Sequence, residues 1–280
     1  MDKKGRKNWG RTERNRNSSQ KTSWGNVADW YDQHLSEADT YHAKVIMPNL
    51  LRLINLKPDE SLLELGCGQG FFLEKLSTFS KNLTGVDVSG ELIALAKRKN
   101  SQINYLVASA GDETILLGKT FDVITVILAL QNIKNLPAVA RNLSRLLKET
   151  GRIYIVLNHP AFRIPQHSDW IYDDKKKIQS RKVDLYLSQV EIPINMNPGQ
   201  TARRFDEKSP VRSSENKMTW SFHRSLQDYS KIFAKNSLVI SKIEEWISHK
   251  KSEPGQRSRA EDSARREFPL FMCLELKKLK

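Results

Sequence analysis

The sequence predicts a doubly wound α/β fold, in which helices cover both faces of a mostly parallel sheet. Between residues 61 and 157, short apolar segments alternate with amphipathic segments of helical period, as in right-handed βαβ units. The first apolar segment runs into three closely spaced glycines. The most apolar segment, Phe121–Leu130, suits a buried strand and is too short to span a bilayer.

The alternating elements are expected in a simple order. The strands fall at residues 61–65, 83–88, 103–108, 121–130 and 152–157, and the helices at 71–79, 90–99 and 136–147. Ser89 is the expected N-cap of the helix at 90–99, because its hydroxyl can accept a backbone N–H of the first turn. Gly151 is expected just past the end of the helix at 136–147.

The segments before the first strand predict a basic arm and a helical flap. Residues 1–22 hold eight Lys or Arg against Asp2 and Glu13 and lack apolar periodicity, so we expect a disordered arm. Helical spacing begins near Trp24, and a second helical stretch runs over residues 41–56. Pro48 is expected to kink or split that stretch, because proline lacks the N–H that a helix interior needs.

The segments after residue 158 predict an insertion followed by the end of the sheet. Residues 159–219 are polar, proline-bearing and aromatic, which favours a cap inserted after the fifth strand. A helix at 225–235 and strands at 238–246 and 270–276 follow. Residues 249–267 mix charges without periodicity and are expected to form a mobile loop. One α/β domain would then span residues 23–280, with no internal repeat.

Composition narrows the function classes. The net charge of +14 suggests a nucleic-acid partner, but part of this positive charge is concentrated in the arm. The hypothesis is therefore a weak contact with RNA through the arm. Only two cysteines, Cys67 and Cys273, are present, which favours a reducing cytoplasm and no disulfide framework. No histidine pair has metal-ligand spacing, so no metal is expected.

The chemical signal lies at the end of the first strand. Glu64 precedes Gly66, Gly68 and Gly70, and the chain then enters a helix. Glycines are expected where the chain turns tightly and a ligand packs on bare backbone. Asp87 ends the second strand, 21 residues after Gly66, where a carboxylate would meet ribose hydroxyls.

Two cofactor classes use such a unit. A dinucleotide site needs a third glycine at position 71, where Phe71 stands instead. It must also hold a pyrophosphate, which the carboxylate of Glu64 would repel. A ligand with an ammonium and a sulfonium suits Glu64 better, which favours S-adenosylmethionine over NAD.

Residues 64–70, 85–89 and 121–124 together resemble the motifs of class I S-adenosylmethionine-dependent methyltransferases. Residues 223–226, 244–246 and 268–275 resemble the small-molecule branch, which is related to quinone-biosynthesis methyltransferases. The resemblance implies a Rossmann-like seven-stranded sheet whose last strand is antiparallel, with S-adenosylmethionine as cofactor. It implies cofactor contacts from Glu64, Gly66, Gly68, Gly70, Asp87, Val88, Ser109, Ala110 and Ile127. Ser109 stands where the family often has an acid for the adenine amino group; its hydroxyl could accept that hydrogen bond more weakly, or Asp112 could substitute from the loop.

Acceptor residues are expected after the fifth strand and in the flap. His159 could act as a general base, or it could be a turn histidine bonded to backbone. Tyr31 beside Trp30, together with Phe162 and Trp170, could wall a pocket. Arg163 could orient a polar or anionic acceptor, or could pair with a surface carboxylate. His223 is a weaker base candidate, Cys67 a small filler, and Arg203, Arg204, Lys208 and Arg212 form a basic cluster in the cap.

The predicted function is direct in-line methyl transfer from S-adenosylmethionine to a small-molecule acceptor. The sequence after the fourth strand reads Leu130-Gln131-Asn132, without the Asn/Asp-Pro-Pro-Tyr of amino-methylating enzymes. The alternatives are an RNA or ribosome-associated methyltransferase using the arm, a catalytically silent scaffold, and a NAD-dependent oxidoreductase. A scaffold would not need all three glycines.

Overall fold

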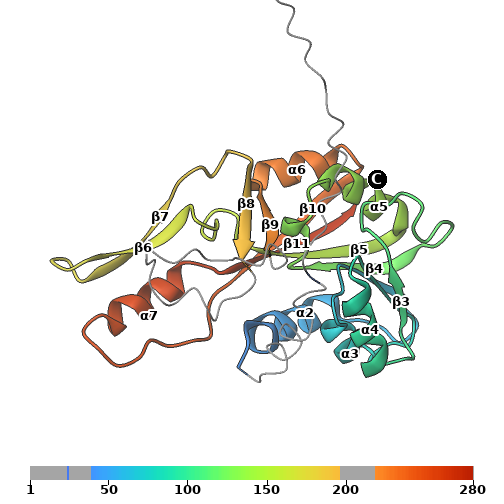
Figure 1. Cartoon of the computed structure of the whole chain (residues 1–280), viewed down its shortest axis with the longest axis horizontal. Helices are drawn as coiled ribbons and strands as arrows, with labels where there is room; N and C mark the ends of the chain where they lie inside the picture. The colour runs from blue at the N-terminus through green and yellow to red at the C-terminus, as the bar shows by residue number, and fades with distance from the viewer. Residues whose placement is uncertain (1–23, 25–38, 196–217, 280) are drawn as a thin grey trace, which may run out of the picture.

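The computed structural model describes residues 24, 39–195 and 218–279, and its centre is one seven-stranded sheet (Figure 1). The strand order is β10-β11-β5-β4-β1-β2-β3. The strands are β1 (Leu62–Leu65), β2 (Leu83–Asp87), β3 (Asn104–Val107), β4 (Phe121–Ile127), β5 (Leu147–Asn158), β10 (Leu238–Trp246) and β11 (Phe271–Lys278). β11 is antiparallel to both β5 and β10, and the other pairings in this sheet are parallel. The predicted doubly wound sheet with an antiparallel last strand is confirmed.

Helices cover both faces of the sheet. One buried cluster packs β1, β4, β5 and β11 against α5 (Leu136–Leu146) and α6 (Leu226–Ala234). The other packs the opposite faces against α2 (Met47–Ile54), α3 (Phe71–Leu76) and α4 (Gly90–Lys99). Figure 1 shows α5 and α6 above the sheet and the other three helices below it. The strands read as nearly continuous apolar runs because both of their faces are buried.

Local sequence signals set the helix starts. The Ser89 hydroxyl accepts the Leu92 N–H at 3.2 Å, so it is the N-cap of α4 as predicted. Ser225 and Asp228 form a reciprocal capping box at the start of α6. Pro48 lies in the first turn of α2, directly after a π-helical turn at His42–Ile46. The stretch changes from π- to α-helix beside Pro48 without an interruption, and a first turn is where a missing N–H is tolerated.

Gly151 corrects one prediction. It does not end α5, whose C-cap is Leu147, but lies inside β5. A Cβ at Gly151 would sit 2.7 Å from the Leu147 Cδ1 and 3.0 Å from the Asp122 carbonyl oxygen. The glycine therefore marks a close approach of strands and not a helix end.

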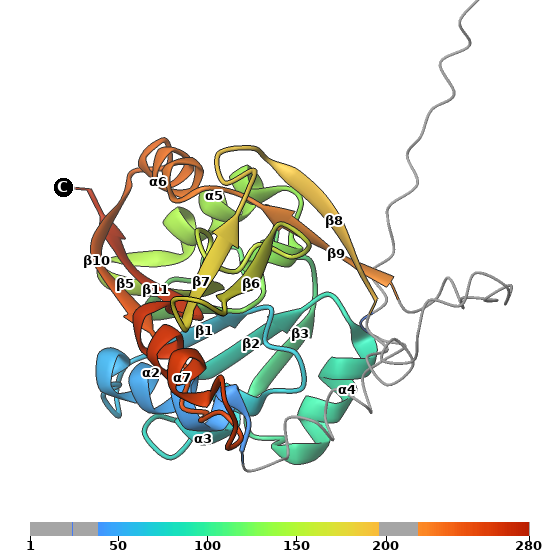
Figure 2. The ribbon, with the colours of Figure 1, turned by 90° about the vertical axis from the view of Figure 1, so that its left-hand side faces the viewer.

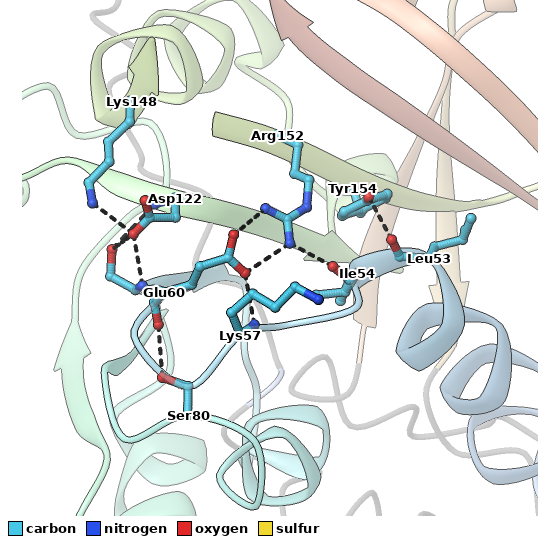
Figure 3. A network of polar contacts seen from close by, with 10 residues as sticks. Leu53, Ile54, Lys57, Glu60, Ser80, Asp122, Lys148, Arg152 and Tyr154 are labelled. Carbon is cyan, nitrogen blue, oxygen red and sulfur yellow. Dashed lines mark hydrogen bonds and ion pairs between the residues drawn. The ribbon is translucent and has the colours of Figure 1, made fainter. Parts of the chain in front are cut away.

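A polar network ties together the amino ends of β1, β4 and β5 (Figure 3). The Arg152 guanidinium donates to both Glu60 oxygens, at 2.7 and 3.0 Å, and to the Ile54 carbonyl at 2.6 Å. Asp122 accepts from the Ser61 backbone and from Lys148, at 2.9 and 2.7 Å. These contacts lower the pKa of Glu60 and bring that of Asp122 to about 2. The network fixes the sheet at the edge opposite the glycine loop.

Two β-ribbons lie between β5 and β10, where the cap was expected (Figure 2). β6 (Ser168–Asp173) pairs with β7 (Ile178–Val183), and β8 (Val190–Asn195) pairs with β9 (Met218–His223). Residues 196–217 of the expected cap, the arm at 1–22 and the first helical stretch of the flap lie outside the described residues.

The segment expected as a mobile loop contains a helix, α7 (Ser258–Glu267), packed on β7 (Figure 1). The prediction of a loop over these residues was wrong. The helix buries Ala264 and otherwise presents charged side chains, so its sequence lacks the wide apolar stripe used to recognise helices. Alanine, glutamate and arginine nevertheless favour the helical backbone, and the hairpin beside α7 covers its narrow apolar face.

Candidate active site

The loop between β1 and α3 is built from left-handed glycines. Gly66, Gly68 and Gly70 have φ values of 75°, 54° and 80°, a region that other residues rarely adopt. The N–H groups of Gly66 and Cys67 both donate to the Val86 carbonyl, at 2.7 and 3.1 Å. Those bonds hold the loop against the end of β2, and Gly70 caps the start of α3.

Two of these glycines also lie so close to neighbouring side chains that a Cβ atom would collide with them. A Cβ at Gly66 would lie 2.4 Å from the Ala129 Cβ, just after β4. A Cβ at Gly70 would lie 2.4 Å from the Tyr105 hydroxyl, on β3. The loop is therefore pressed against both neighbouring strand ends, leaving its backbone as the surface offered to a ligand.

Asp87 at the end of β2 is fixed to this loop. One carboxylate oxygen accepts the Gly68 N–H and the other accepts the Ser89 N–H, both at 2.9 Å. Burial raises the pKa of Asp87, and the bonds from Ser89 and Gly68 act in the opposite direction. The side chain is thus held in one orientation at the carboxyl edge, as its predicted contact with ribose hydroxyls requires.

Glu64 is a buried carboxylate with an oxygen left over. It is 1% exposed, and its Oε2 atom has no hydrogen-bond partner in the described part of the chain. Burial raises the pKa of Glu64 well above its usual range, and the nearby charge of Asp87 raises it further. A buried acceptor without a partner is costly, so a donor or cation supplied by a ligand is what the group lacks.

Gln69 is a functional candidate that the sequence prediction missed. It is 2% exposed, and its Nε2 atom has no partner among the described residues. The end of β1 therefore supplies a buried acceptor on Glu64, and the glycine loop supplies a buried donor on Gln69. An amino acid moiety, with its ammonium and carboxylate, offers the complementary pair. A single glutamine inside a glycine-rich loop has no sequence pattern that marks it as a binding residue.

Apolar side chains stand open beside Asp87. Val88 and Val107 are 54% and 56% exposed. Val88 directly follows β2, and Val107, the last residue of β3, is the strand partner of Asp87. Ser109 is exposed and Ala110 is buried in the loop after β3. The Asn142 side chain donates to the Ala110 and Asp112 carbonyls, at 2.8 and 2.9 Å. Asn142 on α5 thereby fixes the loop that was predicted to contact adenine.

The end of β4 has a strained backbone. Ile127 is buried, and Leu128 follows with a φ of 52°, which is unfavourable for leucine. The Leu128 N–H donates to the Val156 carbonyl at 2.8 Å, and the Gln131 side chain donates to the Leu128 carbonyl at 2.9 Å. The surrounding bonds hold a conformation that turns Ala129 onto Gly66.

His159 has both ring nitrogens occupied. Nδ1 faces the backbone N–H groups of Ala161 and Phe162, at 3.2 and 3.3 Å, so it is the acceptor, and Nε2 donates to Glu245 at 2.7 Å. Burial lowers the pKa of His159. The ring is 4% exposed and stacks on Phe162 with centroids 4.7 Å apart. The structure therefore favours the turn-histidine alternative over the general base. His223, bonded to the Tyr186 carbonyl at 2.9 Å, is likewise held by backbone.

Three predicted acceptor residues come together after β5. Phe162 and Trp170 both meet the Phe268 ring edge-on, with centroids 5.4 and 5.5 Å away. The Arg163 guanidinium lies over the Phe271 ring, 5.2 Å from its centroid. Tyr31 and Trp30 of the flap, and the basic cluster Arg203, Arg204, Lys208 and Arg212, lie outside the described residues.

Other expected features can be checked in part. Cys67 is a free, buried thiol whose pKa burial raises well above its usual range, in keeping with a filler. Cys273 is also free and buried. Within the described ranges, no group of three or more His, Cys, Asp or Glu is placed to hold a metal. Every helix in the part that the structure describes is too short or too polar to cross a membrane.

Comparison with known proteins agrees with this geometry. Residues 63–155 match the family model described as a methyltransferase domain. The chain is 28% identical over 98 residues to ubiquinone biosynthesis O-methyltransferase of Xanthomonas oryzae, covering 34% of this chain and 41% of that protein. It is 32% identical over 123 residues to malonyl-[acyl-carrier protein] O-methyltransferase of Bacillus anthracis, covering 43% and 45%. The chain thus spans less than half the length of these curated relatives.

Solved structures share the fold. An S-adenosylmethionine-dependent methyltransferase from Mesorhizobium loti superimposes with a TM-score of 0.59 at 18% identity, covering 82% of this chain and 96% of that one. One from Clostridium acetobutylicum gives 0.58 at 20% identity, covering 92% and 99%. Residues 63–155 thus match a methyltransferase domain, and the fold is that of solved S-adenosylmethionine-dependent methyltransferases. S-adenosylmethionine is the cofactor that those solved structures use, and the unpartnered oxygen of Glu64 beside the glycine loop fits its cationic end.

Proposed function

We propose that this protein transfers a methyl group from S-adenosylmethionine to a small-molecule acceptor. The observation that carries the proposal is the unpartnered oxygen of Glu64, buried under a left-handed glycine loop whose neighbour Asp87 is already oriented. A site prepared for a dinucleotide would not bury an excess carboxylate beside the place of the pyrophosphate. The NAD-dependent alternative is therefore disfavoured, as is a scaffold without a ligand.

Each cofactor residue has a proposed role. Glu64 would accept from the ammonium of the methionine end, and Gly66, Gly68 and Gly70 would let that end approach the backbone. Asp87 would bind the ribose hydroxyls. Val88 and Ile127 would pack on the adenine, with Ala110 and the Ser109 hydroxyl lining its edge. Asp112 is a weaker candidate for the adenine contact, because its Oδ1 already accepts the Thr114 N–H and hydroxyl, at 2.9 and 2.8 Å.

The chemistry asks little more of the protein than alignment. When bound, S-adenosylmethionine supplies an electrophilic methyl group on a sulfonium, which is a good leaving group. The residues around it need to hold the acceptor in line and exclude water. Since both nitrogens of His159 are occupied, we propose that it shapes the turn after β5 and removes no proton.

The acceptor is proposed from position. The cap ribbons leave the sheet at the carboxyl end of β5, where loops of a rigid α/β scaffold normally carry specificity. The names of the matched relatives describe O-methylation in ubiquinone biosynthesis and of malonyl-[acyl-carrier protein], which supports an oxygen acceptor. The RNA alternative depends on residues 1–22, outside the described part. A cytoplasmic location, expected from cysteine usage, stays a prediction.

Labelled methyl transfer into a fractionated cell extract tests the proposal. The purified chain and methyl-labelled S-adenosylmethionine would be incubated with RNA, protein and small-molecule fractions separately. Label is expected in the small-molecule fraction, and Asp87→Ala is expected to abolish most of it. Label found in RNA alone would reject the small-molecule acceptor, and no S-adenosylhomocysteine binding would reject the function.

A further inference from the structure

Two arginine side chains of the cap base lie near each other at the carboxyl edge of the sheet. Arg163 follows the turn that His159 closes, and Arg181 lies on β7, directly across from Trp170 on β6. Each guanidinium sits over an aromatic ring. Arg163 lies 5.2 Å from the Phe271 centroid, and Arg181 lies 4.8 Å from the Trp170 centroid.

Neither arginine forms an ion pair within the described residues, although the charge of Asp169 acts to raise the pKa of Arg181. Arg181 donates to the Phe162 carbonyl and the Ser168 hydroxyl, at 2.8 and 2.7 Å, both neutral acceptors. The Arg163 guanidinium has the Phe271 ring and neither a hydrogen bond nor an ion pair in the part of the chain that is described. The predicted alternative, that Arg163 pairs with a surface carboxylate, finds no support there.

Two other partly buried arginines of this protein have hydrogen-bond partners for their guanidinium groups. Arg152 is paired with Glu60, and Arg224, at 7% exposure, donates to the Ile133 and Lys134 carbonyls, at 2.9 and 2.7 Å. Arg163 is therefore an exception in its own structure. Burial lowers the pKa of Arg163; Tyr41 acts to raise it, and the charge of Arg181 has a smaller lowering effect. A bound anion would supply the charge partner that Arg163 lacks.

The surroundings are aromatic, and a cavity whose lining includes Phe268 but neither arginine lies beside them. Phe268 touches Phe162 and Trp170, and it also lines this cavity of about 860 Å³ between the β6–β7 hairpin and α7. The cavity continues past Tyr172 and Gln179, which lie two residues from Trp170 and Arg181 along their strands, on the same face of the hairpin. Its volume is in the range of small-molecule sites. An apolar, flat body would fit the rings, and its anionic group would face the guanidiniums.

We propose that the acceptor is a small aromatic or otherwise flat carboxylate, whose carboxylate group is bound by Arg163 and Arg181 while its ring packs on Phe162 and Trp170. This inference rests on the proposed function and names its substrate class. A carboxylate is favoured because a planar guanidinium binds it through two parallel hydrogen bonds. Two arginines and several rings suit a single carboxylate on a flat body better than a nucleic acid backbone, whose recognition needs a row of cations.

Benzoate and benzamide are the probes, because they match in size and differ in charge. Each would be titrated into the chain saturated with S-adenosylhomocysteine, by calorimetry. Benzoate is expected to bind at least about tenfold more tightly than benzamide, since a charge-assisted pair is roughly twice as strong as a neutral one. Arg163→Gln should abolish this preference, and Arg163→Lys should keep only part of it. Arg257→Gln is the matched control, because Arg257 lies over the Tyr172 ring on the same lobe but is exposed.

The outcomes distinguish failure of the carboxylate site from failure of the proposed methyltransferase function. S-adenosylhomocysteine should bind the wild type and all three variants alike, which also shows that each variant is folded. If S-adenosylhomocysteine binds but benzoate does not bind, or binds no better than benzamide, the carboxylate site is rejected and the methyltransferase stands. A preference that survives in Arg163→Gln rejects Arg163 as its source. Tighter binding of phenyl phosphate than of benzoate would replace the carboxylate by a phosphate ester.

Discussion

Replacing Glu64 with glutamine should move stability and cofactor affinity in opposite directions. The carboxylate is 1% exposed and keeps one oxygen without a partner, so the protein without cofactor carries an uncompensated acid. Ionising such a group costs several kcal/mol, whereas a poorly satisfied amide costs about 1–3 kcal/mol. The Glu64→Gln protein without ligand is therefore expected to gain about 1–3 kcal/mol at neutral pH. At this chain length that raises the Tm by roughly 2–8 °C.

The pH dependence has a defined sign. Because the pKa of Glu64 is raised in the folded protein, the folded state holds this proton at pH values at which the unfolded chain has lost it. This group's contribution to stability therefore falls as pH rises from about 4.3, its unfolded value, towards the raised folded value. Glu64→Gln should remove that part of the slope in a series of thermal melts.

Cofactor binding gives the opposing measurement. The ionised carboxylate is proposed to pair with the ammonium of the ligand, and losing a hydrogen bond between charged groups costs about 1.5–3 kcal/mol. Affinity for S-adenosylhomocysteine, measured by calorimetry, should fall by roughly ten- to one-hundred-fold in Glu64→Gln. A variant that melts at a lower temperature than wild type and binds S-adenosylhomocysteine equally well would refute the assignment of Glu64.

Four further predictions concern three single residues and the N-terminal arm. Gly70→Ala should destabilise the fold by about 1–3 kcal/mol, because the new Cβ would clash with the Tyr105 hydroxyl at a residue of positive φ. The Gly70→Ala, Tyr105→Phe double variant should regain part of that stability in urea unfolding. Purely additive losses of stability in the two single variants and the double variant would contradict the clash. His159→Asn should lower the Tm yet leave the pH profile of kcat/KM unchanged, whereas loss of an ionisation from that profile would restore the general base. Asp122→Asn should destabilise the folded protein at neutral pH and far less near pH 2. The pKa of Asp122 is lowered in the folded protein, so the stability that its carboxylate contributes is lost as pH falls through about 2. An equal loss of stability at both pH values would be inconsistent with its ion pair to Lys148. Deleting residues 1–22 should leave S-adenosylhomocysteine affinity intact in a calorimetric titration, and a large loss would show that the arm helps to build the site.

Local signals explain what the sequence could predict. The glycine loop, the N-cap at Ser89 and the uninterrupted apolar strands are short-range patterns, and each is found where it was expected. The failures involve contacts between distant segments. Gly151 is explained by its approach to Asp122, and α7 is stabilised by packing on a hairpin that precedes it by about eighty residues.

The candidate site divides in the same way. Glu64, Asp87 and the glycines follow from a motif, whereas the role of His159 depends on Glu245, which no spacing connects to it. The proposed use of Arg163 together with Arg181 depends on the register of β6 on β7 and on the turn after β5, neither of which a single sequence specifies. Gln69 became visible as a candidate once burial left its amide nitrogen without a partner.

The central claim is that the glycine loop, Glu64 and Asp87 bind S-adenosylmethionine and no dinucleotide. Calorimetric titration of the full chain with S-adenosylhomocysteine and, separately, with NAD tests it most directly. One S-adenosylhomocysteine is expected to bind per chain, with binding weakened by about 1–3 kcal/mol in Asp87→Ala, and NAD is expected to give no heat of binding. Binding of NAD without binding of S-adenosylhomocysteine would contradict the account.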